Sequence, residues 1–166
     1  MFREHAAMQI RTANAADLSE IRTLLAANGL PVEDVSTTVI KGFLIIRDAS
    51  GTIVASGGLQ HLGTSVLLRS LVVTPELRGT GIARRLVARL EADARALGYD
   101  ELWLLTTTAE RFFEAAGYER VSRDDAPADV RSCRQFAVLC PSTAICMRKR
   151  LLPTHCPSAV KRPASS

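Results

Sequence analysis

The sequence predicts one domain of the α/β (α+β) class, in which strands and helices alternate along the chain. Short apolar segments alternate with longer segments whose apolar residues recur at helical spacing. One short segment, Ser65–Val73, is apolar at successive positions from Leu71, as expected of a central strand covered on both faces. With 166 residues and 47% hydrophobic content, the chain can bury one core.

The individual elements follow from periodicity and from residues that start or stop helices. Asn14 is a candidate N-cap with Asp17 in the first turn, and Gly98 stops the longest helix. The expected strands are Gln9–Thr12, Gly42–Arg47, Thr52–Gln60, Ser65–Val73, Glu101–Thr106, Gly117–Ser122 and Ser142–Lys149. The expected helices cover 14–28, 79–97 and 109–116, while 31–38 is irregular or a short helix and 124–139 is a polar connector with helical stretches.

The ends of the chain differ in composition from its body. Residues 8–152 are expected to form the domain, because Met8 opens the first strand pattern. Residues 1–7 are expected to be a flexible extension, and residues 153–166, rich in Pro and Ser, a disordered tail. The start of the chain lacks the apolar stretch of a secretory signal, and no apolar run reaches the roughly 18 residues of a membrane span. We therefore expect a cytoplasmic protein without a membrane partner.

The net charge of +4 is modest and is spread along the sequence. Such a distribution favours an anionic small ligand over nucleic acid, which is not an expected partner. The four cysteines, Cys133, Cys140, Cys146 and Cys156, include no Cys-x-x-Cys pair. No metal site is predicted from their spacing.

A glycine-rich turn, Arg78-Gly79-Thr80-Gly81, joins the central strand to the longest helix. Glycines allow a tight turn and a close approach of the backbone to a ligand, and the free N–H groups of the helix start attract anions. Arg84 stands where the dinucleotide fingerprint needs a third glycine, and no Gly-Lys-Ser/Thr follows. The turn predicts a pyrophosphate site, although an ordinary helix entry would show the same local spacing.

The segment Arg78–Ala83, placed after a strand that ends Leu71-Val72-Val73-Thr74-Pro75, resembles the signature of the GCN5-related N-acetyltransferase (GNAT) superfamily. The later segment Phe112–Tyr118 also resembles a helix-then-strand signature of that family. The resemblance implies a mixed, mostly antiparallel, twisted sheet of about six to seven strands that splays after the fourth strand, with about four flanking helices. It implies acetyl-CoA as the acyl donor, and it allows a homodimer.

The same resemblance assigns roles along the splayed strand and the glycine turn. Backbone groups of Leu71 and Val73 would pair with the pantetheine arm, and the Val73 N–H would polarise the thioester carbonyl. Val72 would be the bulged residue of this strand. The cofactor-binding residues implied are Leu71, Val72, Val73, Arg78, Gly79, Thr80, Gly81, Ile82, Ala83, Arg84, Thr106 and Phe112.

The chemistry expected is direct attack of a neutral amine on the thioester, without an acyl-enzyme. The tyrosine that protonates the leaving sulfur in many family members is replaced here by Phe113. His61 is a candidate general base, with an ordered water or a solvent-facing turn histidine as the alternatives. Thr108 is expected to be an N-cap of the following helix.

The acceptor side offers arginines that suit a carboxylate. Arg69 lies two residues before Leu71, and strand periodicity would place both on one face. With Arg123, Arg131 and Arg134 it would form a cationic pocket, although solvated arginines explain the sequence equally well. The acceptor expected is the primary amine of a small, amino-acid-like molecule. A peptide acceptor and a non-catalytic acyl-CoA or metalloid module are the alternatives.

Three segments, 68–71, 104–108 and 134–147, resemble a branch of the superfamily found in bacterial arsenic-resistance gene clusters. This resemblance suggests a role in arsenic or toxin resistance. Cys140 and Cys146 would then be candidate thiolate ligands of trivalent arsenic, with buried core thiols as the alternative.

Overall fold

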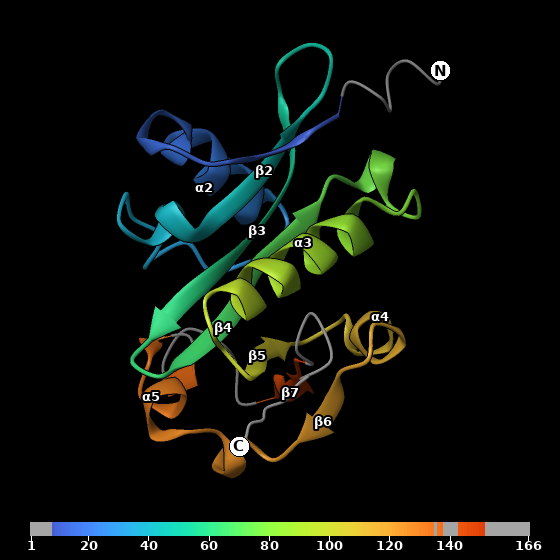
Figure 1. Cartoon of the computed structure of the whole chain (residues 1–166). Helices are drawn as coiled ribbons and strands as arrows, with labels where there is room; N and C mark the ends of the chain where they lie inside the picture. Colours follow the sequence, from blue (N-terminus) through green and yellow to red (C-terminus); the bar gives the residue numbers. More distant parts are fainter. Residues whose placement is uncertain (1–7, 135, 138–142, 152–166) are drawn as a thin grey trace, which may run out of the picture.

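The computed structural model describes residues 8–134, 136–137 and 143–151, in which a seven-stranded sheet carries four α-helices (Figure 1). The strands are β1 Ile10–Thr12, β2 Phe43–Arg47, β3 Ile53–Leu62, β4 Ser65–Val73, β5 Glu101–Thr106, β6 Glu119–Val121 and β7 Ile145–Arg150. The helices are α2 Leu18–Ala27, α3 Ile82–Ala96, α4 Glu110–Ala115 and α5 Ala128–Arg131. Short 3₁₀ turns are η1 Ala15–Asp17, η2 Val39–Gly42, η3 Pro75–Leu77 and η4 Arg123–Asp125.

The strand order is β1-β2-β3-β4-β5-β7-β6, and every neighbouring pair is antiparallel except β4 and β5. The parallel pair is held at a single register position, Leu67 opposite Trp103. Beyond Leu67, no strand among the described residues pairs with the rest of β4 on that side. The mixed, mostly antiparallel sheet that splays after its fourth strand is therefore confirmed.

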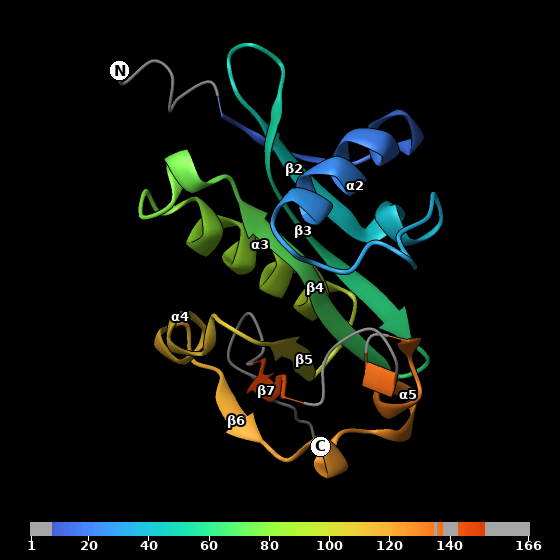
Figure 2. The ribbon, with the colours of Figure 1, turned by 180° about the vertical axis from the view of Figure 1, so that it is seen from behind.

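Helices cover both faces of the sheet, as the two opposite views show (Figures 1 and 2). On one face, α3 and α4 contribute to the largest apolar cluster, which includes Leu86, Leu90 and Phe113. On the other face, α2 packs over β2 through a second cluster, and α5 packs over β4 and β5 through a third. Burial on both faces explains why β4 is apolar at successive positions.

The sheet and helices match the expected elements, with differences at their ends. Helix α3 begins at Ile82 rather than Gly79, because Gly79 and Gly81 have φ of 80° and 89°, outside the helical region. Residues 31–38 form turns rather than a second helix. The expected extension 1–7, the tail 153–166 and Cys140 lie outside the described residues. Among the residues described, no helix is both long and apolar enough to cross a bilayer.

One residue of β4 departs from strand geometry and corrects an expectation. Ser70 has φ of 58°, and the register with β3 shifts at this point, because Val72 pairs with Ser56 while Arg69 pairs with Gly58. The bulge therefore lies at Ser70 and not at Val72. An extra residue reverses the alternation of side chains, so Arg69 and Leu71 lie on opposite faces, contrary to the periodicity argument.

Candidate functional site

The glycine turn before α3 lines a cavity of about 520 Å³. The turn exposes both glycines, and the intrahelical hydrogen bonds begin only where the Arg85 N–H donates to the Gly81 carbonyl at 3.0 Å. The preceding N–H groups are the helix-start donors that an anion can accept. The cavity is lined by Val73, Leu77, Arg78, Gly79, Gly81, Ile82, Ala83, Arg84 and Phe112.

Arg78 links this turn to the neighbouring helix. Its Nε donates to the Val73 carbonyl at 3.1 Å, and its Nη2 donates to Asn28 Oδ1 at 2.9 Å, just after α2. Arg84 is exposed beside the helix start. Thr80 does not line the cavity, because its hydroxyl donates to the Leu77 carbonyl within the turn at 2.6 Å.

The space where β4 leaves β5 forms a second cavity, of about 540 Å³. It is lined by Asn28, Gly29, Leu30, Pro31, Leu68, Arg69, Ser70, Leu71, Leu104, Leu105, Thr106, Thr107, Thr108, Ala109, Phe113 and Ala144. Thr106 lines it as predicted, and its hydroxyl accepts the Ala109 N–H at 3.0 Å. Thr108 was expected to cap α4. The threonine whose hydroxyl accepts an N–H at the start of this helix is instead Thr106.

Backbone groups of β4 face the splayed side at alternate residues. The Thr74 N–H donates to the Val54 carbonyl of β3 at 2.9 Å. Because successive backbone groups of a strand point to opposite edges, the Val73 N–H is directed away from β3, toward the side that β5 has left. Val73 lines the cavity of the glycine turn, while Leu71 lines the cavity of the splayed strands.

Comparison with known proteins gives the family. Residues 40–120 match a family model described as an acetyltransferase (GNAT) domain. This part of the chain is therefore similar to a GNAT acetyltransferase domain. It contains β4, the glycine turn, the start of α3 and β5, which line much of both cavities. Residues 28–31 and Ala144, which also line the splayed cavity, lie outside the match.

Solved structures share this fold. An N-acetylglutamate synthase from Neisseria gonorrhoeae, solved with coenzyme A and N-acetyl-glutamate, superposes with a TM-score of 0.75 at 21% identity, covering 87% of this chain and 35% of that one. Rv2747 from Mycobacterium tuberculosis, solved with CoA and NLQ, has a TM-score of 0.73 at 22% identity, covering 87% of this chain and 99% of that one.

Curated relatives include amino-acid acetyltransferases. That of Ralstonia nicotianae is 43% identical over 61 residues, covering 37% of this chain and 14% of the relative. That of Pseudomonas aeruginosa PAO1 is 32% identical over 136 residues, covering 77% of this chain and 31% of the relative. This chain thus spans less than a third of the length of these relatives. An N-acetyltransferase of Chlorobaculum tepidum is 26% identical over 140 residues and is covered at 87% of its length.

The arginines predicted on the acceptor side of the GNAT domain do not converge. Arg123 donates to the carbonyls of Ala144 and Phe136 at 3.3 and 2.8 Å, and Arg131 Nε donates to the Ala126 carbonyl at 3.0 Å. Arg134 is exposed. Of the four, only Arg69 lines the splayed cavity. The predicted pocket of four guanidinium groups is therefore not formed, because the connector uses two of them to hold its own backbone.

Arg69 itself is already paired. Its side chain is 0% exposed, and its fork donates to both carboxylate oxygens of Asp34 at 2.6 and 2.7 Å. Burial would raise the pKa of Asp34, but the hydrogen bonds and charge of Arg69, with a smaller contribution from Arg134, hold it below its ordinary value. Asp34 therefore remains ionised, and Arg69 is not an open fork for an incoming carboxylate. No motif or spacing in the sequence indicated a role for Asp34.

His61 lies away from both cavities. It stands one residue before the end of β3, where its Nδ1 is 3.1 Å from the Tyr99 hydroxyl and the two rings stack at 5.6 Å. Together with Asp93 and Leu97 it borders a separate depression at the C-terminal end of α3. This placement argues against the predicted role of His61 as general base, because its position on β3 turns the side chain toward α3.

No tyrosine takes the place of Phe113 in the splayed cavity among the residues described. Tyr118 follows α4, but its hydroxyl donates to Glu91 at 2.9 Å inside the protein. Burial and the charge of Glu91 raise the pKa of Tyr118, so it stays protonated. The hydroxyls present at the cavity are those of Ser70 and of residues 106–108.

Cys146 is the described member of the candidate arsenic pair. It is 2% exposed, and burial raises the pKa of its thiol to about 11. Within the described residues, no group of three or more His, Cys, Asp or Glu side chains is placed to hold a metal ion. The geometry of Cys146 is that of a core thiol, packed with Trp103 and Phe136.

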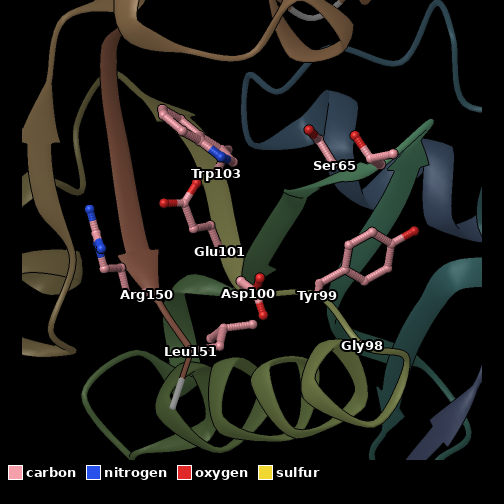
Figure 3. Close-up of a pocket in the computed structure, with 9 residues that line it drawn as sticks. Ser65, Gly98, Tyr99, Asp100, Glu101, Trp103, Arg150 and Leu151 are labelled. Carbon is pink, nitrogen blue, oxygen red and sulfur yellow. The ribbon is translucent and has the colours of Figure 1, made fainter. Parts of the chain in front are cut away.

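A third cavity, also of about 540 Å³, lies at the opposite end of α3 (Figure 3). Figure 3 shows Trp103 and Glu101 from β5, Ser65 from the start of β4, and Arg150 from the end of β7 around it. No residue that the sequence analysis singled out as a site residue lines it. Its mixture of acidic and basic side chains does not select one ligand charge.

Proposed function

We propose that this chain transfers the acetyl group of acetyl-CoA to the primary amine of a small, amino-acid-like acceptor by direct attack. The observation that carries the proposal is the arrangement of two cavities along one strand. The helix-start amides of α3 lie at the C-terminal end of β4, and the splayed cavity begins two residues earlier. A diphosphate at the first cavity would lead its pantetheine arm along β4 into the second.

The thioester of such a ligand lies at the far end of the pantetheine arm. Leu71 lines the splayed cavity, whereas Val73 lines the cavity of the glycine turn. We therefore assign polarisation of the thioester carbonyl to the Leu71 N–H, two residues before Val73, whose N–H was expected to do so. Val73 remains a candidate partner of the arm. A preorganised N–H donor stabilises the oxyanion that forms when the amine attacks.

The proton of the amine must leave without a dedicated side-chain base. Among the described residues that line the splayed cavity there is no carboxylate and no imidazole. An α-amine has an ordinary pKa of about 8 and is partly neutral near neutral pH, so water can take the proton while positioning supplies most of the rate. The leaving thiolate of CoA would be protonated by solvent or by a hydroxyl of residues 106–108.

The amino-acid acceptor is supported by the amino-acid acetyltransferases among the relatives. The arsenic-resistance role has only the three sequence segments in its support. Free-thiol release from acetyl-CoA with a panel of amino acids, glutamate-like compounds bearing arsenic or phosphorus, and a peptide mixture would separate these acceptors. The homodimer stays a prediction, which light scattering on the purified chain would test.

Substitution Gly81→Glu tests the cofactor site directly. It places a carboxylate at the start of α3, where the diphosphate is proposed to bind, at a φ of 89° that L-residues avoid. The affinity for acetyl-CoA, measured by calorimetry, should fall about tenfold or more. A tenfold fall corresponds to a loss of roughly 1.4 kcal/mol of binding free energy. Gly98→Glu is the matched control, because Gly98 lies just after α3, with φ of 92° and open space around it. Equal affinity in Gly81→Glu and the control would refute the proposal.

A further inference from the structure

A buried hydrogen bond holds the bulge of β4. Ser56 of β3 is 0% exposed, and its hydroxyl donates to the Ser70 carbonyl at 2.9 Å. Ser70 is itself buried and has a φ of 58°. This region is unfavourable for a residue with a Cβ, so the surrounding contacts must maintain it.

The bond from Ser56 fixes more than the carbonyl that accepts it. The peptide unit between Ser70 and Leu71 is planar and trans, so its N–H points opposite to its C=O. Because the Ser70 carbonyl faces the Ser56 hydroxyl of β3, the Leu71 N–H faces away from β3. That direction is toward the splayed cavity, which Leu71 lines.

A second set of contacts holds the Ser70 side chain. Arg69 Nε lies 3.1 Å from Ser70 Oγ and donates to it, and Arg69 Nη1 donates to Gln60 Oε1 at 3.0 Å. The guanidinium is held in turn by both carboxylate oxygens of Asp34, in the segment that follows α2. The bulge is thus fixed from β3 on one side and from the loop after α2 on the other.

We propose that Ser56 is a positioning residue for acetyl transfer, whose hydroxyl aims the Leu71 N–H at the thioester carbonyl, and that the Asp34–Arg69 pair locks the same peptide unit. The inference rests on the proposed function, because it needs a thioester in the splayed cavity. Neither Ser56 nor Asp34 touches the reacting atoms. Their contribution is the orientation of one amide.

The test measures the polarisation of the bound thioester rather than turnover alone. Infrared difference spectra of carbonyl-¹³C acetyl-CoA on the wild-type chain should show the C=O stretch shifted to lower frequency by the N–H donor. Ser56→Ala should lose most of this shift while keeping its affinity for CoA without the acetyl group. With an acceptor from the panel, kcat should fall about tenfold or more, with little change in the KM for acetyl-CoA.

Ser65→Ala is the matched control, because Ser65 is a buried serine of β4 at the opposite end of the strand. Its infrared shift should equal that of the wild type. If Ser56→Ala does not fold, Asp34→Asn provides the same measurement from the other side of the bulge. A wild-type shift in a folded Ser56→Ala or Asp34→Asn chain would overturn the positioning role. If the wild type bound no acetyl-CoA, the proposed function itself would fail and take the inference with it.

Discussion

At the scale of single residues, Arg69 is a buried charge whose hydrogen bonds hold the backbone bulge of β4 in place. Three of its nitrogens donate to Ser70, Asp34 and Gln60, and the side chain has no exposed surface. Desolvating an ion pair offsets much of its Coulomb energy, so such a pair adds little to stability over an apolar pair. The bidentate pair of Arg69 with Asp34 does orient the guanidinium, which in turn holds Ser70 at the bulge.

Residue chemistry also decides the reactivity of the thiol at position 146. Raising the pKa from 9.0 to about 11 lowers the thiolate fraction at pH 8 about 100-fold, and only the thiolate reacts. We expect Cys146 in the folded chain to be labelled by iodoacetamide at pH 8 at least about 100-fold more slowly than in guanidinium, measured by peptide mass spectrometry. Arsenite should not protect it. Fast labelling in the native chain, slowed by arsenite, would restore Cys146 as a candidate arsenic ligand.

At the scale of elements, the start of the first helical segment shows local sequence acting as predicted. Asn14 Oδ1 accepts the Ala16 N–H, and the Asp17 carboxylate accepts the Asn14 N–H, which together form a capping box. The tertiary structure adds Arg47 of β2, whose Nη2 lies 2.7 Å from Asp17 Oδ1. A local cap thus also joins the helix to the sheet.

This corner should make the stability of the chain depend on acid. Burial would raise the pKa of Asp17, but the Asn14 N–H, Arg47 and Arg11 together hold it below its ordinary value of 3.8. Its contribution is therefore complete above pH 3.8 and is lost as the pH falls through the lower, folded value.

Asp17→Asn should lower the free energy of unfolding by about 1 to 3 kcal/mol at pH 7, measured by urea titration. The difference from the wild type should shrink below about pH 4. Asp93→Asn, on the exposed side of α3, should change it by no more than about 0.5 kcal/mol. An Asp17→Asn effect of equal size at pH 3 and pH 7 would contradict the linkage.

At the scale of the whole molecule, the sheet consists of two parts joined at one strand pair. Strands β1 to β4 form one part and β5, β7 and β6 the other, with Leu67 opposite Trp103 between them (Figure 1). Glu91 links the two parts, because it lies on α3, which packs on β3 and β4, and bonds to residues of the other part. It accepts hydrogen bonds from Tyr118 at 2.9 Å and from Lys149 of β7 at 2.9 Å. Because β4 and β5 pair at one position only, the contacts of Glu91 help to hold the two parts of the sheet together.

Tyr118→Phe removes one of these contacts while keeping the ring. We expect the free energy of unfolding to fall by about 1 to 2 kcal/mol in urea, because buried Glu91 loses a hydrogen bond but keeps Lys149. Tyr99→Phe is the control and should cost about 0.5 kcal/mol or less, since its hydroxyl lies 3.1 Å from Nδ1 of the exposed His61. If both variants were equally stable, the hydrogen bond from Tyr118 to Glu91 would contribute nothing to stability.

The features that could be predicted from the sequence are those that depend on residues close together in the chain. The glycine turn, the helix that follows it, the Asn14 cap and the apolar pattern of β4 depend on residues close in the chain, so their positions were predictable within a few residues. The cavity beside this turn, where we propose that the diphosphate binds, was predictable for the same reason.

The arrangement of residues around the splayed cavity depends on contacts between segments that are distant in the chain. One extra residue at Ser70 moves Arg69 to the face opposite Leu71, and the partners that stabilise this bulge, Ser56 and Asp34, come from segments 14 and 36 residues away in the chain. Side-chain periodicity is a local rule, and it cannot register a bulge whose stability depends on contacts between distant segments.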